Sequence, residues 1–434
     1  MMSILSYSFV LKKIEKRRKK NYQKENVFSL FSFFSSLYPK KPMTNASFIP
    51  YARQSINSAD ITSVADALSS NWITRGPHVE GFEASIAEYC GAKYAVAFNS
   101  GTSALAAACY AANVGPYDRL ITTPNSFIAS VGAGIKFGAT PVFVDIDHTT
   151  GNVDIDQMAY NANLSFSRGR PILVPVHFAG VPVNVQKLDR EITNPDTIII
   201  EDACHALGSR YSPEGPKVGS CAWSAMTIFS FHPAKTITTG EGGMVTTNEE
   251  EFCHRLKLYR NNGIERDPKY LEGESSPWYY EVKDITDNHN FTEFQAALGR
   301  SQMSRLNQFI ARRFDLMEAY KARLNDWMDV ALLTPEFDRS IAFHLCVVKI
   351  KFDSFKTTRT DVMKKLLSSH IGTQVHYIPL YRHPYFVKKY GEVHEYFPKM
   401  EEYYSRTLTL PLYYDLTLDN IDFVVKTLKG CLQA

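Results

Sequence analysis

The sequence predicts an α/β fold with a mostly parallel central sheet, helices on both faces, and a smaller α+β domain after it. Three observations predict this fold. Short apolar runs alternate with helical periodicities over residues 58–201, which is the pattern of parallel strands joined by covering helices. A strongly helical stretch follows at 292–324, and mixed β-type and helical patterns follow that stretch. We therefore expect a large α/β domain over residues 46–290, and a helical connection with a small domain over 291–434.

The individual elements are predicted from apolar spacing and from the residues that punctuate it. The first helix is expected over residues 58–68, with Ser58 or Asp60 as its cap. Further helices are expected over 79–89, 104–112, 127–137, 157–164, 185–192 and 249–260. Strands are expected over 94–98, 119–123, 141–145, 172–176, 197–201, 225–231 and 243–247. In the small domain, β-type patterns cover 344–352 and 373–377, and a helical pattern covers 359–368.

Composition indicates a soluble globular protein that does not bind nucleic acid. Hydrophobic residues make up 44% of the 434 residues and charged residues 21%, which is ordinary for such proteins. The formal net charge is +3, but residues 1–42 carry ten Lys or Arg and two Glu, so the remainder holds about −5. A nucleic-acid surface would need a basic excess in the folded part.

Residues 1–45 are expected to be a disordered or non-native leader, with Met43 as the natural start. The leader has a basic run at 12–20 and an apolar run at 27–38. The apolar run is too short to span a bilayer, so no membrane span is expected, and attachment to a membrane surface or a partner is the alternative. The seven cysteines are irregularly spaced, which favours reduced thiols and a cytoplasmic location.

Lys235 and Asp202 are the candidate catalytic residues. Lys235 lies between a β-type run and a glycine-rich turn, a context that would hold its amine beside a cofactor carbonyl, where a Schiff base forms. Asp202 follows three isoleucines and Glu201 at the end of an apolar strand, where a carboxylate is costly unless it is paired. Pyridoxal phosphate requires such a lysine, and an acid for its pyridinium nitrogen. Each residue alone also has a plain structural interpretation, as a solvated lysine or a helix-capping acid.

Further features add to this pair. Residues 99–103 are small and polar and lie between a strand and a helix, so the helix N-terminus would bind a phosphate; an ordinary helix cap is the alternative. His205 would reach the phenolic oxygen of the cofactor, and Phe127 would stack on its ring. A structural histidine and a core aromatic are the alternatives for these two residues. Segments 376–377 and 383–385 would line a pocket, or pack in the core.

Other kinds of binding site find no support in the sequence. The glycines between residues 132 and 138 resemble a dinucleotide motif, but they lie within a helical stretch and not in the turn after a strand. This placement argues against a nicotinamide-dependent oxidoreductase. The glycines at 240–243 lack the Lys-Ser/Thr of a P-loop. The histidines and cysteines have no metal-ligand spacing.

Taken together, these motifs resemble the sugar-nucleotide aminotransferases of the DegT/StrS type, a branch of the fold-type-I pyridoxal phosphate enzymes. The resemblance runs from about residue 49 to the C-terminus. Several segments are closer still to the family members that act on UDP-sugars in pseudaminic acid synthesis. These segments are 49–56, 71–77, 175–180, 277–281 and 375–381.

The resemblance implies pyridoxal 5'-phosphate as cofactor, and transamination at C4 of a UDP-4-keto-6-deoxy-N-acetylhexosamine with L-glutamate as donor. It implies Lys235 as the Schiff-base lysine and Asp202 as the partner of the pyridinium nitrogen. Asn288 matches an asparagine that reaches the cofactor of a second subunit, which implies a homodimer with shared active sites. The other cofactor positions are Gly101, Thr102, Phe127, His205 and Ser230. The implied sugar-nucleotide contacts are Tyr51, Asn71, Trp72, Ile73, Thr74, Val375, His376, Tyr377 and Ile378.

Two positions depart from the family pattern. Asn262 stands where a histidine is common, and Asn290 stands where an arginine is common. The loss of a cation near the substrate would alter how the donor carboxylate or the sugar diphosphate is held. Three other functions stay open: a bacillosamine-type UDP-4-amino sugar aminotransferase, a sugar dehydratase on the same scaffold, and a non-catalytic regulatory protein that binds the cofactor. The dehydratases typically replace the Schiff-base lysine by histidine, so Lys235 argues against that alternative.

Overall fold

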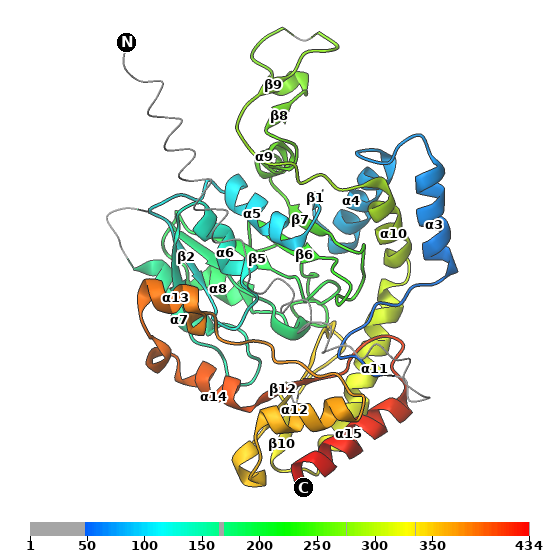
Figure 1. Ribbon diagram of the computed structural model, residues 1–434. Helices are drawn as coiled ribbons and strands as arrows, with labels where there is room; N and C mark the ends of the chain where they lie inside the picture. The colour runs from blue at the N-terminus through cyan, green and yellow to red at the C-terminus, as the bar shows by residue number, and fades with distance from the viewer. Residues whose placement is uncertain (1–47, 165–168, 275, 335, 434) are drawn as a thin grey trace, which may run out of the picture. The chain divides into compact units, whose positions relative to one another are not determined.

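A seven-stranded sheet forms the centre of the computed structural model (Figure 1). The structure describes residues 48–433 except 165–168, 275 and 335. The chain from Ile49 onward forms one compact unit. The predicted leader over residues 1–45 lies outside the described residues. The strands of this sheet are β1 (Tyr94–Phe98), β2 (Arg119–Thr122), β3 (Thr140–Phe143), β4 (Pro171–Val174), β5 (Ile198–Asp202), β6 (Met226–Ser230) and β7 (Gly243–Thr247).

The sheet is mostly parallel, as the sequence predicts. Its strand order is β1-β7-β6-β5-β4-β2-β3. The strands from β6 to β3 pair in parallel, and β7 runs antiparallel to its neighbours β1 and β6. The carboxyl ends of the parallel strands meet at one edge, which is where sheets of this kind bind ligands. Asp202 ends β5 and Lys235 follows β6, so both catalytic candidates lie at this edge.

Helices cover both faces of the sheet. They are α4 (Pro77–Cys90), α5 (Gly101–Ala111), α6 (Ala129–Lys136), α7 (Ile155–Asn163), α8 (Val185–Glu191) and α9 (Glu250–Arg260). Val96 and Leu120 pack with α5, α6 and α9, whereas their chain neighbours Ala97 and Ile121 pack with α4 and with α7 and α8, respectively. This alternation is expected for strands that are buried on both faces.

The start of α3 (Ser58–Ser69) differs from the prediction. Asn57 caps this helix, and not Ser58 or Asp60. The Asn57 side chain accepts a hydrogen bond from the Asp60 N–H at 3.0 Å, and the Asp60 carboxylate accepts one from the Asn57 N–H at 3.0 Å. This reciprocal pair of hydrogen bonds is a capping box. Asp60, which was expected to cap the helix, instead accepts a hydrogen bond from the backbone of the capping residue Asn57.

Two other segments also differ from the prediction. The helical stretch over 292–324 is two helices, α10 (Glu293–Met303) and α11 (Leu306–Leu324). The break comes at Arg305, whose ψ of 1° leaves the helical range and whose guanidinium contacts the buried Asp60. Residues 373–377 form no strand, because Gln374 makes only an isolated bridge to Thr409.

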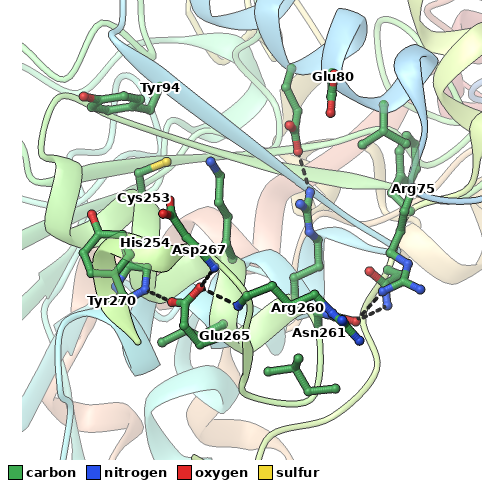
Figure 2. A pocket seen from close by; sticks show the side chains of 18 of the residues that line it. Arg75, Glu80, Tyr94, Cys253, His254, Arg260, Asn261, Glu265, Asp267 and Tyr270 are labelled. Atoms are coloured by element: carbon green, nitrogen blue, oxygen red, sulfur yellow. Dashed lines mark hydrogen bonds and ion pairs between the residues drawn. The ribbon is translucent and has the colours of Figure 1, made fainter. Parts of the chain in front are cut away.

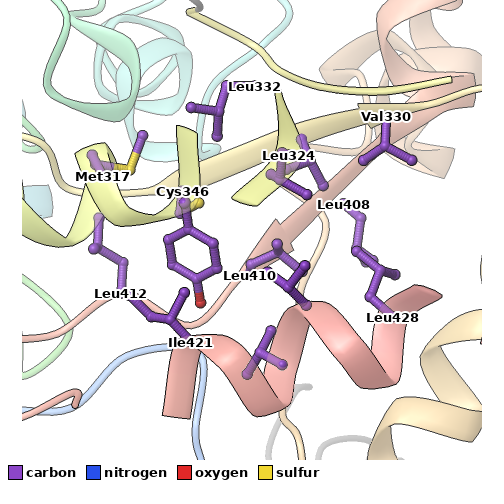
Figure 3. Packing of buried hydrophobic residues seen from close by; sticks show 14 of the residues in the cluster. Met317, Leu324, Val330, Leu332, Cys346, Leu408, Leu410, Leu412, Ile421 and Leu428 are labelled. Carbon is purple, nitrogen blue, oxygen red and sulfur yellow. The ribbon is translucent and has the colours of Figure 1, made fainter. Parts of the chain in front are cut away.

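A second sheet holds the C-terminal part together, and most of it was not predicted. Its antiparallel strands are β10 (Val330–Leu332), β11 (Cys346–Ile350) and β12 (Thr407–Leu410). α11, α12 (Arg359–Ser368) and α15 (Leu418–Gln433) cover it with an aliphatic core that includes Leu324, Leu410 and Leu428 (Figure 3). The division of the chain near residue 290 stays a prediction.

The remaining elements lie outside the two sheets. β8 (Ile264–Glu265) and β9 (Glu281–Val282) form a small antiparallel hairpin that extends away from them (Figure 1). α13 (Pro384–Tyr390) and α14 (Pro398–Arg406) lie between β11 and β12 in the chain. Short 3₁₀ turns cover Phe178–Gly180, Pro268–Tyr270, Phe352–Phe355, Leu380–Arg382 and His394–Tyr396.

Candidate active site

A cavity of about 1060 Å³ opens at the carboxyl edge of the large sheet. Small-molecule sites usually measure about 300–1,000 Å³, so this cavity has room for a cofactor together with a substrate. Its wall comes from the turns after β1, β2, β5 and β6 and from residues 374–378. The predicted site residues that line it are Tyr51, Gly101, Thr102, Phe127, Asp202, His205, Ser230, Lys235, Val375, His376, Tyr377 and Ile378.

Lys235 lies in the turn after β6. Its backbone N–H donates to the carbonyl of His232 at 2.8 Å. Burial lowers the pKa of the Lys235 ammonium, and the neighbouring Cys204 and Asp202 act in the opposite direction. A lowered pKa increases the fraction of neutral amine, which is the form that attacks a carbonyl. Lys235 can therefore act as a nucleophile or as a proton acceptor in this cavity.

Asp202 is held by two hydrogen bonds and is 5% exposed. Its Oδ1 accepts from the Cys204 N–H at 3.1 Å, and its Oδ2 accepts from the Ser130 hydroxyl at 2.5 Å. A carboxylate has about four acceptor sites, so Asp202 can accept from a ring N–H and keep both present partners. Ser130 was not predicted, because only the folded chain brings the first turn of α6 to the end of β5.

Five histidines line the same cavity, and three of them are buried: His205, His344 and His376. Burial is the main cause that lowers the pKa of each, and the charge of Lys235 lowers all three further; the pKa of His376 falls to about 3. All three are therefore neutral near pH 7. The Ala179 N–H donates to His205 Nδ1 at 3.3 Å, so the proton of a neutral His205 is on Nε2, which lies 3.2 Å from the Tyr377 hydroxyl.

His344 is the histidine that sequence reasoning missed. Its ring centre lies 4.4 Å from that of His205, and the residue is 4% exposed. Its Nδ1 is buried without a hydrogen-bond partner among the described residues. In the sequence it is the first residue of the β-type pattern over 344–352, and nothing local distinguishes it there from a core position.

A cradle for an anion lies where β1 meets α5. A Cβ atom on Gly101 would lie 3.0 Å from Cβ of Ser230, so only glycine permits this approach without a shift. Ser100 caps the helix by accepting from the Ser103 N–H at 3.1 Å. The amides of Gly101 and Thr102 lie in the first turn, where no helical carbonyl can satisfy them. Together with the Ser230 hydroxyl, these amides can bind a phosphate.

Five predicted residues do not line this cavity: Asn71, Trp72, Ile73, Thr74 and Asn288. Trp72 and Ile73 are 60% and 56% exposed. Asn288 forms a backbone bridge with Asn261, and its side chain accepts from the Asn290 N–H at 3.1 Å. These five positions therefore do not contribute to the wall of the cavity in their own chain.

A second cavity, of about 380 Å³, lies beside α4, α9 and residues 261–267 (Figure 2). Several of its charged groups pair with one another. Arg260 Nη1 lies 2.5 Å from Glu83 Oε1, and His254 Nε2 contacts Glu265 Oε2. This cavity is therefore polar, and two of its acids contact neighbouring basic side chains.

The two departures from the family pattern fall in or next to the second cavity. Arg75 Nη1 donates to Asn261 Oδ1 at 3.1 Å, and Asn290 Nδ2 donates to the same oxygen at 3.2 Å (Figure 2). Asn262 follows directly, with a φ of 58° in the left-handed region. Neither Asn262 nor Asn290 lines the cavity that contains Lys235.

The described ranges contain neither a metal-binding cluster nor a membrane-spanning helix. Within residues 48–433, apart from the gaps given above, no group of three or more His, Cys, Asp or Glu side chains is arranged to hold a metal ion. His376 Nδ1 instead lies 2.9 Å from the Thr409 hydroxyl. None of the helices in those ranges combines the length and the apolar character needed to cross a membrane.

Comparison with known proteins identifies the family. The sequence model of the DegT/DnrJ/EryC1/StrS aminotransferase family matches residues 54–429 of this chain. The chain belongs to this family. A family relative, the spore coat polysaccharide biosynthesis protein SpsC of Bacillus subtilis, is 34% identical over 389 residues, which are 89% of this chain and 97% of that protein.

Solved structures of family members agree with this assignment. PseC of Helicobacter pylori, an aminotransferase involved in the biosynthesis of pseudoaminic (pseudaminic) acid, is 28% identical, with a TM-score of 0.80 over 89% of this chain and 100% of that one. Spr1654 of Streptococcus pneumoniae, described as a sugar aminotransferase, is 27% identical, with a TM-score of 0.79 over 89% and 99%. Spr1654 is known in pyridoxamine phosphate and pyridoxal phosphate forms. The chain is therefore a pyridoxal phosphate-dependent sugar aminotransferase of fold type I.

The Lys235 cavity contains the groups that this cofactor needs. The amides at the start of α5 and the Ser230 hydroxyl fit its phosphate. Because Gly101 has no side chain, its backbone amide stays accessible to this phosphate beside Ser230. Asp202 fits the ring nitrogen, and Lys235 fits the carbonyl carbon. When bound, pyridoxal phosphate supplies an electron sink for carbanion charge. The role of each individual residue stays a prediction.

Proposed function

We propose that this aminotransferase transfers the amino group of L-glutamate to C4 of a UDP-4-keto-6-deoxy-N-acetylhexosamine. The product would be UDP-4-amino-4,6-dideoxy-N-acetyl-β-L-altrosamine, on the route to pseudaminic acid. The observation that carries the proposal is a cavity of about 1060 Å³ shared by Lys235 and Asp202. Three of the five most similar segments also supply residues to its wall, through Tyr51, Val176 and residues 375–378. The likeness to the Helicobacter pylori enzyme supports the choice of sugar.

Lys235 has two tasks in this proposal. Nζ would hold the cofactor through its carbonyl carbon, and it would serve as the proton-transfer group of the site. As a neutral amine, Nζ would accept the proton from Cα of glutamate and later return a proton as an acid, and it would serve in the same way for C4 of the sugar. The lowered pKa of Lys235 favours the neutral amine that accepts this proton. A lysine at this position also argues against a dehydratase.

Asp202 and His205 orient the cofactor in the proposed mechanism. Asp202 accepts the ring N–H and so maintains the positive charge that makes the ring electron-withdrawing. His205 carries its proton on Nε2, since Nδ1 accepts from the Ala179 N–H at 3.3 Å. Nε2–H can therefore donate to the phenolic oxygen, in exchange for its present contact with the Tyr377 hydroxyl at 3.2 Å.

The Lys235 cavity has too little positive charge for such substrates, which supports a homodimer. Among the described residues that line it, Lys235 is the one Lys or Arg, and Asp202 and Glu241 are acids. A sugar diphosphate and a donor carboxylate are normally bound by cations or by backbone amides. We therefore propose that a second subunit completes each site and that Asn288 is among the residues it contributes. If so, mixing inactive Lys235→Ala and Asn288→Ala proteins should restore activity, because some mixed dimers keep one intact site. No recovery after confirmed subunit exchange would contradict shared sites.

A cytoplasmic location completes the proposal. All seven cysteines are free, and six of them are buried. Unpaired thiols in a folded protein are typical of reducing compartments. Fractionation of the native cells would test this location directly.

The decisive experiment supplies the purified protein with glutamate and two 4-keto UDP-sugars, the L-arabino and D-xylo epimers at C5. Mass spectrometry and NMR identify the product. Amination of the L-arabino sugar alone would support the proposal, whereas preference for the D-xylo sugar would indicate a bacillosamine-type enzyme. If neither sugar reacts and glutamate does not bleach the visible cofactor band, the non-catalytic regulatory alternative is favoured.

A further inference from the structure

A chain of two buried hydroxyl groups lies behind Asp202. Ser130 Oγ lies 2.5 Å from Asp202 Oδ2, and Ser126 Oγ lies 2.5 Å from Ser130 Oγ. Ser126 is 3% exposed and Ser130 is 1% exposed. The Phe127 carbonyl is a second acceptor near Ser130, at 3.2 Å. The chain therefore joins the turn after β2, through the first turn of α6, to the end of β5.

The hydrogen-bond inventory fixes the direction of this chain. Each serine hydroxyl has one proton to donate, and an ionised carboxylate only accepts. When Asp202 is ionised, Ser130 donates to Asp202 and accepts from Ser126. When Asp202 is protonated, Asp202 becomes the donor, and Ser130 must turn toward the Phe127 carbonyl or toward Ser126. In the first arrangement each hydrogen bond polarises and strengthens the next.

The short contact favours a role for Ser130 that goes beyond filling space. If the hydroxyl served only to satisfy a buried polar group, the Phe127 carbonyl would be a sufficient acceptor, but Ser130 lies closer to Asp202, at 2.5 Å against 3.2 Å. The other carboxylate oxygen is held by the Cys204 N–H at 3.1 Å. With one donor on each oxygen, the carboxylate plane of Asp202 cannot rotate without losing a hydrogen bond.

We propose that Ser130, oriented by Ser126, is a positioning residue that fixes the Asp202 carboxylate opposite the ring nitrogen of the cofactor. This inference rests on the proposed role of Asp202. It follows from the fold as well: Asp202 and Ile200 point to the sheet face that α6 covers. Ser126 lies in the turn before α6, and its hydroxyl approaches that of Ser130 in the first turn of the helix to 2.5 Å.

The test uses holoenzyme that contains pyridoxal phosphate labelled with ¹⁵N in the ring, because the ¹⁵N resonance reports the hydrogen bond at that nitrogen. Asp202→Asn defines the resonance of a ring that has lost its carboxylate partner. Ser130→Ala should move the resonance part of the way to that value and lower kcat about 10-fold, the loss expected for one hydrogen bond to a charged group. The KM for glutamate should stay within about 2-fold, because Ser130 does not line the cavity. Ser130→Thr keeps the hydroxyl and should restore most of both.

Ser126 and a matched control sharpen the test. Ser126→Ala should lower kcat about 3-fold on its own and add nothing in a Ser130→Ala background, since it acts through Ser130. Thr122→Val removes another fully buried hydroxyl, which donates to the Val174 carbonyl at 2.7 Å, and it should leave the resonance in place.

Three outcomes would overturn the inference. Ser130→Ala could move the resonance no further than Thr122→Val does, or Ser126→Ala could have the same effect in both backgrounds. If Ser130→Ala yields no holoenzyme, an unmoved resonance in Ser126→Ala would have the same meaning. An unmoved resonance in Asp202→Asn would instead show that the proposed role of Asp202 is wrong, so the two failures can be told apart.

Discussion

The two cavities differ in how their charged groups are satisfied. In the Lys235 cavity, no ion pair within 4.0 Å joins Lys235 to an acid among the described residues, and three buried imidazoles next to it are neutral. In the second cavity, Arg260 is paired with Glu83, and His254 contacts Glu265 (Figure 2). The first cavity thus contains buried titratable groups with shifted pKa values, whereas the second contains a partly buried Arg–Glu ion pair.

This difference suggests separate roles for the two cavities, one in catalysis and the other in the stability of the fold. Groups that are desolvated and lack an opposite charge have perturbed pKa values, which are typical of catalytic sites. A partly buried ion pair has the opposite property, because its loss leaves one charge without compensation. We therefore expect substitutions in the Lys235 cavity to change turnover more than folding, and substitutions in the second cavity to change folding more than turnover.

The largest expected effect comes from Lys235→Ala. It removes the amine that carries the cofactor and moves the proton, so turnover should fall by about 10⁴-fold or more. The visible absorption band of the cofactor should disappear as well. The matched control is Lys257→Ala in the second cavity, which should keep the band and about the same rate. An active Lys235→Ala protein without the band would show that the catalytic lysine is wrongly assigned.

The next effect is a loss of stability in the second cavity. Arg260 and Glu83 side chains are only 17% and 13% exposed, and Glu83 Oε1 also accepts from the Ala97 N–H at 2.8 Å. Arg260→Gln leaves the Glu83 charge partly buried, which should lower the free energy of unfolding by about 1–3 kcal/mol. A urea titration should show a lower midpoint with an unchanged slope. The visible cofactor band should be retained in the folded protein.

A surface pair provides the control for Arg260→Gln. Arg323 contacts Asp422, and their side chains are 28% and 58% exposed. Arg323→Gln should cost no more than about 0.5 kcal/mol, because solvent screens such a pair. If the two variants lose the same stability, or if Arg260→Gln loses the cofactor band while still folded, the contrast between the cavities is not the one described above.

The large sheet could be predicted because its strands are apolar, buried on both faces and separated by clear helical patterns. The predicted ranges 94–98 and 243–247 are the observed β1 and β7. β10 was missed because a strand of three residues is too short to show a period, and β12, of four residues, was missed as well. Arg305 broke a continuous helical pattern through a contact with Asp60, which no local pattern contains.

The same distinction applies to the active site. Lys235 and Asp202 could be found because each lies in a local context, next to a strand, that suits its chemistry. Ser130 reaches Asp202 across 72 positions of the chain, and His344 reaches His205 only after the C-terminal segment has folded against the large sheet. Residues that position or surround the reacting groups depend on this packing, so the sequence alone does not distinguish them from ordinary core residues.

The last expected effect is a pH dependence that belongs to the Lys235 cavity. His376 is 8% exposed, and burial, then the charge of Lys235, lowers its pKa to about 3. An unfolded histidine has a pKa of about 6.5, so the unfolded chain binds more protons between these two values. The contribution of His376 to stability is therefore complete above about pH 6.5 and is lost as the pH falls toward 3, by up to about 1.4 kcal/mol for each pH unit. His205 and His344 act in the same direction.

His376→Asn should make the decline of stability in acid less steep. Urea titrations between about pH 6 and pH 4 should show that the free energy of unfolding falls less steeply with decreasing pH, by about 1 kcal/mol per pH unit. The reason is that the unfolded variant no longer binds a proton at residue 376 that the folded protein lacks. His394→Asn provides a surface comparison, since the His394 side chain is 41% exposed and lies 3.6 Å from Glu392. If His376→Asn matches the wild type, the His376 imidazole is not held neutral, and the Lys235 cavity then tolerates charge much as the second cavity does.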